Sequence, residues 1–179
     1  MLDINQAALL VIDIQDKLLV KIPTAESLVA ETVRAIKFAR ALDLPIFWAE
    51  QYPKGLGPTA EAIRVELEGL EPHAKTAFGC MGDSRCAETL RTMNRRQLLL
   101  VGIETHVCIN QTALSALEQG YEVFVARDAV GSRHAAQHEA GLDRIRQAGG
   151  TLVTVEMALF EMLREAGTDA FKAVLPLLK

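Results

Sequence analysis

Three side chains of this sequence could together perform nucleophilic chemistry: the thiol of Cys108, the carboxylate of Asp13 and the ammonium of Lys75. A carboxylate can take the proton of a neighbouring thiol and later return it to a leaving amine. An ammonium close by offsets the negative charge that develops on the sulfur and on the substrate. If the fold brings them together, these groups predict a cysteine nucleophile that attacks a carbonyl carbon.

Cys108 follows an apolar segment and begins a predicted helix. Residues 98–101 are predicted as a buried strand, and residues 108–120 show helical periodicity that ends at Gly120, a suitable C-cap. At a helix N-terminus, unpaired backbone N–H groups and the helix dipole favour a thiolate, so we expect the pKa of Cys108 to be lowered. The alternative is a buried structural cysteine, the usual state of a lone cysteine in an apolar segment.

Asp13 and Lys75 belong to two other predicted strands. Asp13 closes an apolar run that begins at Ala7, the form of a strand buried on both faces of a sheet. Lys75 lies in the segment 73–78, which is predicted as a strand only from its place in the alternation of elements. An Asp at a strand end often orders a turn, and most lysines are solvated. The catalytic interpretation therefore depends on whether both residues converge on Cys108.

Strands and helices alternate along the chain. Strands are predicted at 7–13, 45–49, 73–78, 98–101, 121–126 and 151–154, and helices at 24–42, 59–67, 84–94, 108–120 and 135–148. Apolar strands in this alternation predict an α/β fold of three layers, with a doubly wound parallel sheet covered by helices on both faces. Ligands of such sheets bind beyond the carboxyl ends of the strands. Asp13, Lys75 and Cys108 should gather at that edge.

The composition is that of an ordinary globular protein, and we expect a single domain over residues 1–179. Half of the 179 residues are hydrophobic, and the formal net charge is −4 at pH 7. Lys and Arg are scattered and form no basic stripe, so we expect no nucleic-acid partner. No apolar segment approaches the roughly 20 residues that span a bilayer, and the first residues lack a positively charged leader. We therefore expect a cytoplasmic protein with no membrane partner.

The cysteines lack the pattern of a disulfide framework or a structural zinc site. Cys80, Cys86 and Cys108 are an odd number, in a chain long enough for an ordinary core. Neither Cys80 nor Cys86 has a second Cys or a His at zinc-finger spacing. A redox-active thiol protein remains an alternative function, and it would need Cys80 or Cys86 close to Cys108 as the resolving thiol.

Several segments, in order along the chain, resemble the isochorismatase-like cysteine hydrolases, and among these the branch of isochorismatase domain-containing proteins. The segments are VIDIQ (11–15), EQYPKGLGPT (50–59), AKT (74–76), GIETHVC (102–108) and DAVGSR (128–133). The resemblance implies a catalytic triad of Asp13, Lys75 and Cys108. It also implies an oxyanion hole made by the backbone N–H groups of Glu104 and Cys108, beside a cis peptide at Ile103–Glu104. For the whole chain it implies a Rossmann-like sheet of six strands in the order 3-2-1-4-5-6, and a homo-oligomer.

The chain also departs from relatives of that family. Metal-dependent nicotinamidases of the superfamily carry an Asp and two His after the second strand, where this chain has Glu50, Gln51 and Tyr52. We therefore expect no metal site and no cofactor, since Glu50 alone would hold a cation weakly. Named isochorismatases generally lack the cysteine. Retention of Cys108 favours hydrolysis of a C–N bond in a small amide, ureide or carbamoyl compound.

Five further residues are candidates to line the pocket for a small-molecule substrate. Each has an alternative: Trp48 could belong to the core, His106 could satisfy loop backbone, and Gln15 could brace the site by hydrogen bonds. His134 and His138 are interpreted as a solvated helix start rather than as metal ligands. The pocket candidates are Gln15, Trp48, Tyr52, Phe78 and His106.

Two further functions compete with the hydrolase. A protein of the same fold could bind or sense a small molecule, or act as a scaffold, without turnover, and an intact triad weighs against it. A haloacid-dehalogenase-type phosphotransferase would also place an Asp at the end of the first strand. That chemistry needs a second acid two residues later, where this chain has Gln15.

Overall fold

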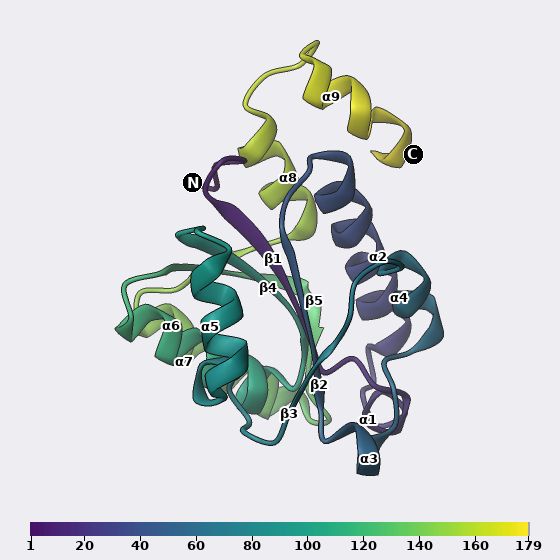
Figure 1. Cartoon of the computed structure of the whole chain (residues 1–179), viewed down its shortest axis with the longest axis vertical. Helices are drawn as coiled ribbons and strands as arrows, with labels where there is room; N and C mark the ends of the chain where they lie inside the picture. The colour runs from purple at the N-terminus through teal and green to yellow at the C-terminus, as the bar shows by residue number, and fades with distance from the viewer. Residues whose placement is uncertain (179) are drawn as a thin grey trace.

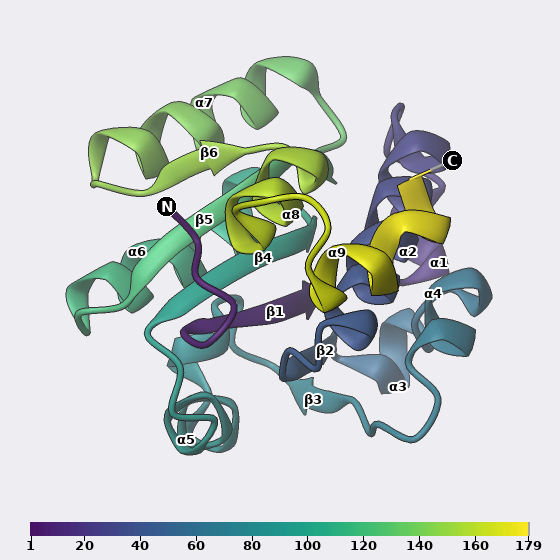
Figure 2. The same ribbon diagram turned by 90° about the horizontal axis from the view of Figure 1, so that it is seen from above.

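A computed structural model describes residues 1–178 and shows three layers, with a twisted sheet between two layers of helices (Figure 1, Figure 2). In this part of the chain, six parallel strands have the order β3-β2-β1-β4-β5-β6, which confirms the expected fold class. The strands are β1 (Ala7–Ile12), β2 (Ile46–Gln51), β3 (His73–Lys75), β4 (Gln97–Ile103), β5 (Glu122–Gly131) and β6 (Thr151–Val153).

Helices cover both faces of the sheet. One face carries α5, α6 and α7, and the other carries α2, α4 and α8, with α9 packed beside α2 (Figure 1, Figure 2). Within residues 1–178, no helix is long and apolar enough to cross a membrane. The α-helices are α1 (Asp16–Leu19), α2 (Ala25–Ala41), α3 (Pro53–Leu56), α4 (Glu61–Glu66), α5 (Ser84–Thr92), α6 (Asn110–Glu118), α7 (Ala135–Gln147), α8 (Val155–Leu163) and α9 (Asp169–Val174). Three short turns complete them: the 3₁₀ turns η1 (Cys80–Gly82) and η3 (Leu175–Leu178), and the π-helical turn η2 (Thr105–Ile109).

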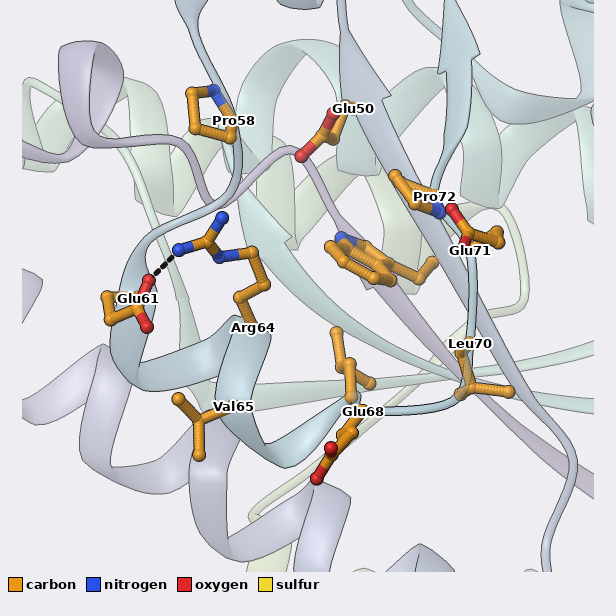
Figure 3. A pocket seen from close by; sticks show the side chains of 11 residues that line it. Glu50, Pro58, Glu61, Arg64, Val65, Glu68, Leu70, Glu71 and Pro72 are labelled. Atoms are coloured by element: carbon orange, nitrogen blue, oxygen red, sulfur yellow. Dashed lines mark hydrogen bonds and ion pairs between the residues drawn. The ribbon is translucent and has the colours of Figure 1, made fainter.

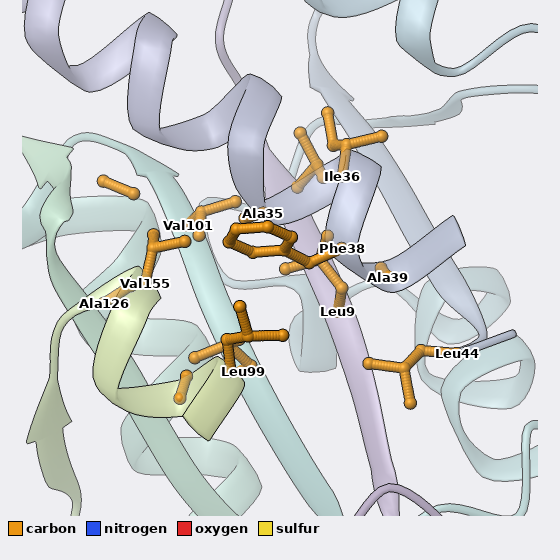
Figure 4. Packing of buried hydrophobic residues seen from close by; sticks show 14 of the residues in the cluster. Leu9, Ala35, Ile36, Phe38, Ala39, Leu44, Leu99, Val101, Ala126 and Val155 are labelled. Carbon is orange, nitrogen blue, oxygen red and sulfur yellow. The ribbon is translucent and has the colours of Figure 1, made fainter. Parts of the chain in front are cut away.

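The core consists of two apolar clusters, one on each face of the sheet. Alternate residues of a strand point to opposite faces, so Leu9 and Val11 pack toward α2 while Leu10 and Ile12 pack toward α5 and α6. Figure 4 shows the first cluster, with Phe38 of α2 lying over β1 and β4. Burial of each large aliphatic side chain contributes about 1.5–3 kcal/mol, which explains why the strands are apolar throughout.

Element boundaries differ from the predicted ones mainly near the carboxyl edge of the sheet. Strand β3 ends at Lys75, and β5 continues to Gly131. Helix α6 begins at Asn110, because residues 105–109 form η2 in front of it. These differences lie where the chain leaves the regular sheet, and there tertiary contacts decide the conformation.

Strand β4 passes very close to the end of β1, and a glycine makes this possible. Gly102 has φ 133° and pairs with Ile12, and a Cβ at position 102 would overlap the carbonyl oxygen of Ile12. One residue further on, the peptide bond between Ile103 and Glu104 is cis. The chain then enters η2, so Cys108 is delivered beside the residue that follows β1, which is Asp13.

Candidate active site

Asp13 and Lys75 form a buried ion pair at the carboxyl edge of the sheet. Lys75 Nζ lies 2.7 Å from Asp13 Oδ2, and both side chains are 0% exposed. Asp13 has φ 58°, a left-handed conformation that Asp tolerates better than most residues, and its N–H donates to the carbonyl oxygen of Ala49. The carboxylate is therefore fixed between β1, β2 and β3.

The ammonium of Lys75 has a full set of acceptors. Besides Asp13, it donates to Gln51 Oε1 at 2.7 Å and to the carbonyl oxygen of Phe78 at 2.9 Å. Gln51 Nε2 in turn donates to the carbonyl oxygen of Thr76 at 2.9 Å. Sequence reasoning missed Gln51 as a site residue, although its place just after the second predicted strand was an available signal. Its register beside Lys75 comes only from the structure.

Burial and charge act against each other on this pair. Burial raises the pKa of Asp13, and the attraction of Lys75 lowers it only in part, so the net pKa lies above its ordinary value. For Lys75, burial lowers the pKa, but the negative charge of Asp13 more than compensates and the net pKa is raised. Asp13 is therefore a stronger base than an ordinary carboxylate, and Lys75 holds its proton more firmly than an ordinary lysine.

Cys108 lies next to this pair, inside η2 and in front of α6, with 6% of its surface exposed. The placement near a helix start agrees with expectation, but the expected lowering of the Cys108 pKa is wrong. Burial raises the pKa of the thiol, the charge of Asp13 raises it further, and Lys75 lowers it only in part. In the resting site the sulfur carries its proton.

The Asp13 carboxylate has one oxygen ready for that proton. Oδ2 accepts from Lys75, whereas Oδ1 is buried and accepts no conventional hydrogen bond within residues 1–178. The thiol of Cys108 is close enough to act on the pKa of Asp13 as a hydrogen-bond donor does, lowering it. The arrangement can therefore pass a proton from sulfur to carboxylate without moving the Lys75 contact.

The segment in front of Cys108 is held by a second ion pair, at the rim of the site. Arg133 Nε lies 2.6 Å from Glu104 Oε1, and Arg133 Nη2 lies 3.2 Å from Glu104 Oε2. His106 Nδ1 lies 3.0 Å from Ser132 Oγ, so two side chains of this segment contact the end of β5. The N–H of Glu104 donates to no backbone acceptor in residues 1–178 and is free for another partner.

The structure places the other pocket candidates at three different locations. Gln15 is fully buried and donates to the carbonyl oxygens of Gln51 and Gly57, so it braces the site. Tyr52 and Phe78 are about half exposed and flank Lys75. The backbone N–H of Tyr52 donates to the carbonyl oxygen of Lys75, and the carbonyl oxygen of Phe78 accepts from Lys75 Nζ. Trp48 lies on the opposite face of the sheet from Cys108 and lines a pocket there.

Cys80 and Cys86 form no disulfide, and both are fully buried. Burial raises the pKa of each thiol to about 12. His138 Nδ1 lies 2.9 Å from Thr105 Oγ1 and so supports η2. Within residues 1–178 no three His, Cys, Asp or Glu side chains are grouped as a metal site would need.

Comparisons with known proteins agree with this fold. The family model described as the isochorismatase domain matches residues 7–157. "Isochorismatase domain-containing protein 2" of Danio rerio is 38% identical over 173 residues, which cover 96% of this chain and 86% of that protein.

Two solved structures are similar over nearly the whole chain. One is a MAR1 ribonuclease from Caenorhabditis elegans, with a TM-score of 0.93, 34% identity, and coverage of 99% of this chain and 91% of that chain. The other is the YcaC gene product of Escherichia coli, described as an octameric hydrolase of unknown specificity. It has a TM-score of 0.92, 26% identity, and coverage of 99% of this chain and 88% of that one.

Proposed function

This chain belongs to the isochorismatase family, and we propose that it is a metal-independent cysteine hydrolase that cleaves a C–N bond of a small amide, ureide or carbamoyl compound. The observation that carries the proposal is the arrangement of Asp13. One carboxylate oxygen is fixed by Lys75 at 2.7 Å, and the other is buried beside the Cys108 thiol without a conventional donor. That oxygen is the base for the thiol proton.

The reaction begins when the proton of Cys108 passes to Asp13 and the sulfur attacks the carbonyl carbon. The carbonyl oxygen becomes an oxyanion, for which the N–H groups of Glu104 and Cys108 are the donors. Asp13 then gives its proton to the leaving nitrogen, the C–N bond breaks, and an acyl thioester remains on Cys108. Water attacks this thioester with Asp13 as the base, which releases the acid and restores the thiol.

Lys75 keeps its proton throughout these steps. Its four partners, Asp13, Gln51 and the carbonyl oxygens of Ala77 and Phe78, hold the ammonium in place. The positive charge offsets the charge on sulfur as the proton leaves, because at short range in a buried site this attraction is weakly screened. The resting thiol and the ionised carboxylate together carry one negative charge, which Lys75 balances.

Metal independence rests on how Glu50 and Gln51, the last two residues of β2, are used. Glu50 accepts two hydrogen bonds from Thr59, and both ends of the Gln51 amide bind protein groups. We expect activity to survive exhaustive chelation, and loss of activity that returns with zinc, iron or manganese would overturn this part of the proposal.

A panel of nicotinamide, ureides, carbamoyl amino acids and aliphatic amides, scored by ammonia release, tests the reaction. With a substrate that turns over, acid quenching should trap a mass adduct on the peptide containing Cys108, and hydroxylamine should divert product to the hydroxamate. Cys108→Ala should abolish both, whereas the matched variant Cys86→Ala should retain them. Turnover without adduct or hydroxamate would favour direct attack by water on the substrate.

Two names among the similar structures suggest further tests. The octameric neighbour supports a homo-oligomer for this chain, which light scattering of the purified protein would measure. Another neighbour is named a ribonuclease, but here the triad is at most 6% exposed and the net charge is −4, so a polynucleotide fits poorly. Cleavage of RNA that depends on Cys108 would replace the amide proposal.

A protein that binds a small molecule without turnover is the remaining alternative. It would bind a compound of the panel and release no ammonia, and its Cys108→Ala variant would bind equally well. We favour the enzyme because Asp13, Lys75 and Cys108 are arranged as acid–base chemistry requires, and binding alone gives no reason to bury an ion pair beside a thiol.

A further inference from the structure

A pocket lies on the face of the sheet opposite Cys108, between β2, α4 and the segment that leads into β3 (Figure 3). Its volume is about 600 Å³, which is large enough for a small organic molecule. The polar residues and the aromatic residue that line it are Trp48, Glu50, Glu61, Arg64, Glu68 and Glu71. We refer to it as the Trp48 pocket.

Glu50 is the buried polar group of the Trp48 pocket. Its side chain comes from β2, and the residue is 5% exposed. Oε1 accepts from the N–H of Thr59 at 2.6 Å and from Thr59 Oγ1 at 2.9 Å. Oε2 accepts no hydrogen bond from residues 1–178, although Glu50 lines the pocket and its carboxylate points into it (Figure 3). Oε2 faces the open space of the pocket and is not among the fully buried unpartnered atoms of residues 1–178, so it is accessible to a donor group of a ligand.

Trp48 forms an apolar wall of the same pocket. Its Nε1 donates to Thr59 Oγ1 at 2.8 Å, so the polar atom of the indole is already used. What the indole can offer a ligand is its ring, which attracts cations as well as apolar groups. Apolar lining completes this wall, from Pro58, Val65, Leu70 and Pro72.

The charge of the pocket is strongly negative. Glu50, Glu61, Glu68 and Glu71 all line it, against Arg64 alone as a basic residue. Arg64 is paired with Glu61 at the rim, and no ion pair joins it to Glu50 within residues 1–178 (Figure 3). The same residues contain no cluster that could hold a metal ion. The acidic lining and the apolar wall together favour a cation that also has apolar surface.

We propose that the Trp48 pocket binds a small organic cation of the alkylammonium class, with the ammonium on Glu50 and the alkyl part against Trp48. The site is separate from the proposed reaction, because it lies on the other face of the sheet. A contact between the two exists through Thr59, whose backbone pairs with Gln15, the residue that braces Gln51.

Trp48 is the single tryptophan of the sequence, so its fluorescence reports on this pocket specifically. The purified full-length chain is titrated with butylamine and 1,4-diaminobutane, and with 1-butanol as the neutral isostere, at constant ionic strength. Calorimetry of the same titrations measures binding independently of fluorescence. We expect saturable binding of both amines, tighter for the diamine because its second ammonium reaches the rim carboxylates, and no binding of 1-butanol.

Variants separate the specific site from general attraction to an acidic protein. Glu50→Gln keeps the shape and should weaken butylamine binding by about tenfold or more. Glu118→Gln removes an exposed carboxylate of α6 on the other face and should change nothing. Arg64→Gln removes the resident cation and should strengthen binding. No calorimetric binding to the parent, or equal affinities of the parent and Glu50→Gln, would overturn the proposal. None of these measurements uses catalytic activity, so the proposed reaction stands or fails separately.

Discussion

Two ion pairs at the carboxyl edge of the sheet differ in their surroundings. The pair of Asp13 and Lys75 is 2.7 Å long, and both side chains are 0% exposed. The pair of Glu104 and Arg133 is 2.6 Å long, but the Arg133 side chain is 49% exposed and that of Glu104 is 10% exposed. The two distances are nearly equal, but the interaction energies differ, because solvent screens the second pair and barely reaches the first.

The difference indicates different tasks. Loss of one partner from the buried pair leaves an isolated charge in an apolar place, so the pair controls protonation beside Cys108. Loss of Glu104 leaves the Arg133 charge where water can reach it, and loss of Arg133 leaves Glu104 with His106 Nε2 at 3.7 Å. The rim pair positions the segment in front of Cys108, where the N–H of Glu104 is free. The buried pair should therefore determine chemistry, and the rim pair should adjust geometry.

The largest contrast is expected in turnover. Asp13→Asn should lower kcat by about 10²–10⁴-fold, because an amide cannot accept the thiol proton. Glu104→Gln should lower kcat by less than about tenfold, because it weakens a positioning contact and leaves the backbone N–H in place. Ammonia release under saturating substrate measures both, and circular dichroism checks that each variant is folded. Similar losses in the two variants would remove the distinction between the pairs.

Stability should show the next largest contrast. Lys75→Met should lower the free energy of unfolding by about 3–5 kcal/mol, since Asp13 stays buried without its partner. Arg133→Met should lower it by no more than about 1 kcal/mol. Urea unfolding at neutral pH measures both. The double variant Asp13→Asn/Lys75→Met should regain most of the loss, and a double variant less stable than Lys75→Met would show that the buried charge is not the cause.

The pH dependence of activity should distinguish the two pairs by the position of its acid limb rather than by the amount of activity lost. Asp13 must be ionised to accept the thiol proton, so activity falls as the pH drops through its pKa, which burial raises above the usual 3.8. Lys75→Met removes an attraction that lowers this pKa, so the acid limb should move to higher pH. Arg133→Met should leave it in place. A limb that moves equally in both variants would assign it to another group.

The pKa of Lys75 predicts the alkaline limb of the same pH profile. The pKa of Lys75 is raised above its usual 10.5, so the stability contributed by the protonated ammonium is complete at lower pH and is lost only as the pH rises through the raised value. Activity should therefore stay level from neutral pH to about pH 10. Stability should begin to fall nearer pH 9, because burial raises the pKa of all three cysteine thiols above the usual 9.0 and they ionise first in the unfolded chain. A larger loss of stability above pH 10 in the parent than in the double variant would assign the difference to the pair, and equal losses would assign the alkaline limb to the thiols.

Thiol reactivity should give the smallest contrast. Because burial and Asp13 raise the pKa of Cys108, iodoacetamide should label it several-fold more slowly than the unfolded chain. Cys108 should still react before Cys80 and Cys86, which are fully buried. Lys75→Met should slow labelling of Cys108 further, and Arg133→Met should not. Peptide mapping after timed alkylation measures all three thiols, and faster labelling of Cys80 in the folded protein would contradict the order.

Much of the fold follows from local patterns in the sequence. The apolar run before Asp13 predicted β1, and the run before Gly102 predicted β4, because a strand buried on both faces has no room for polar residues. The sequence pattern for strand β3 was weak, because the strand has only three residues and is partly exposed. Its pairing with β2 stabilises it more than its own composition does.

The sequence by itself determined the residue types available for chemistry, the alternation of strands and helices, and, through the resemblance, the candidates Asp13, Lys75 and Cys108. Tertiary structure decided the Lys75–Asp13 contact across 62 residues, the role of Gln51 and the separation of Trp48 from the triad. It also raises the pKa of Cys108, which the sequence had led us to expect to be lowered. The physical reason is that a pKa depends on burial and on nearby charges, and both come from residues far apart in the chain.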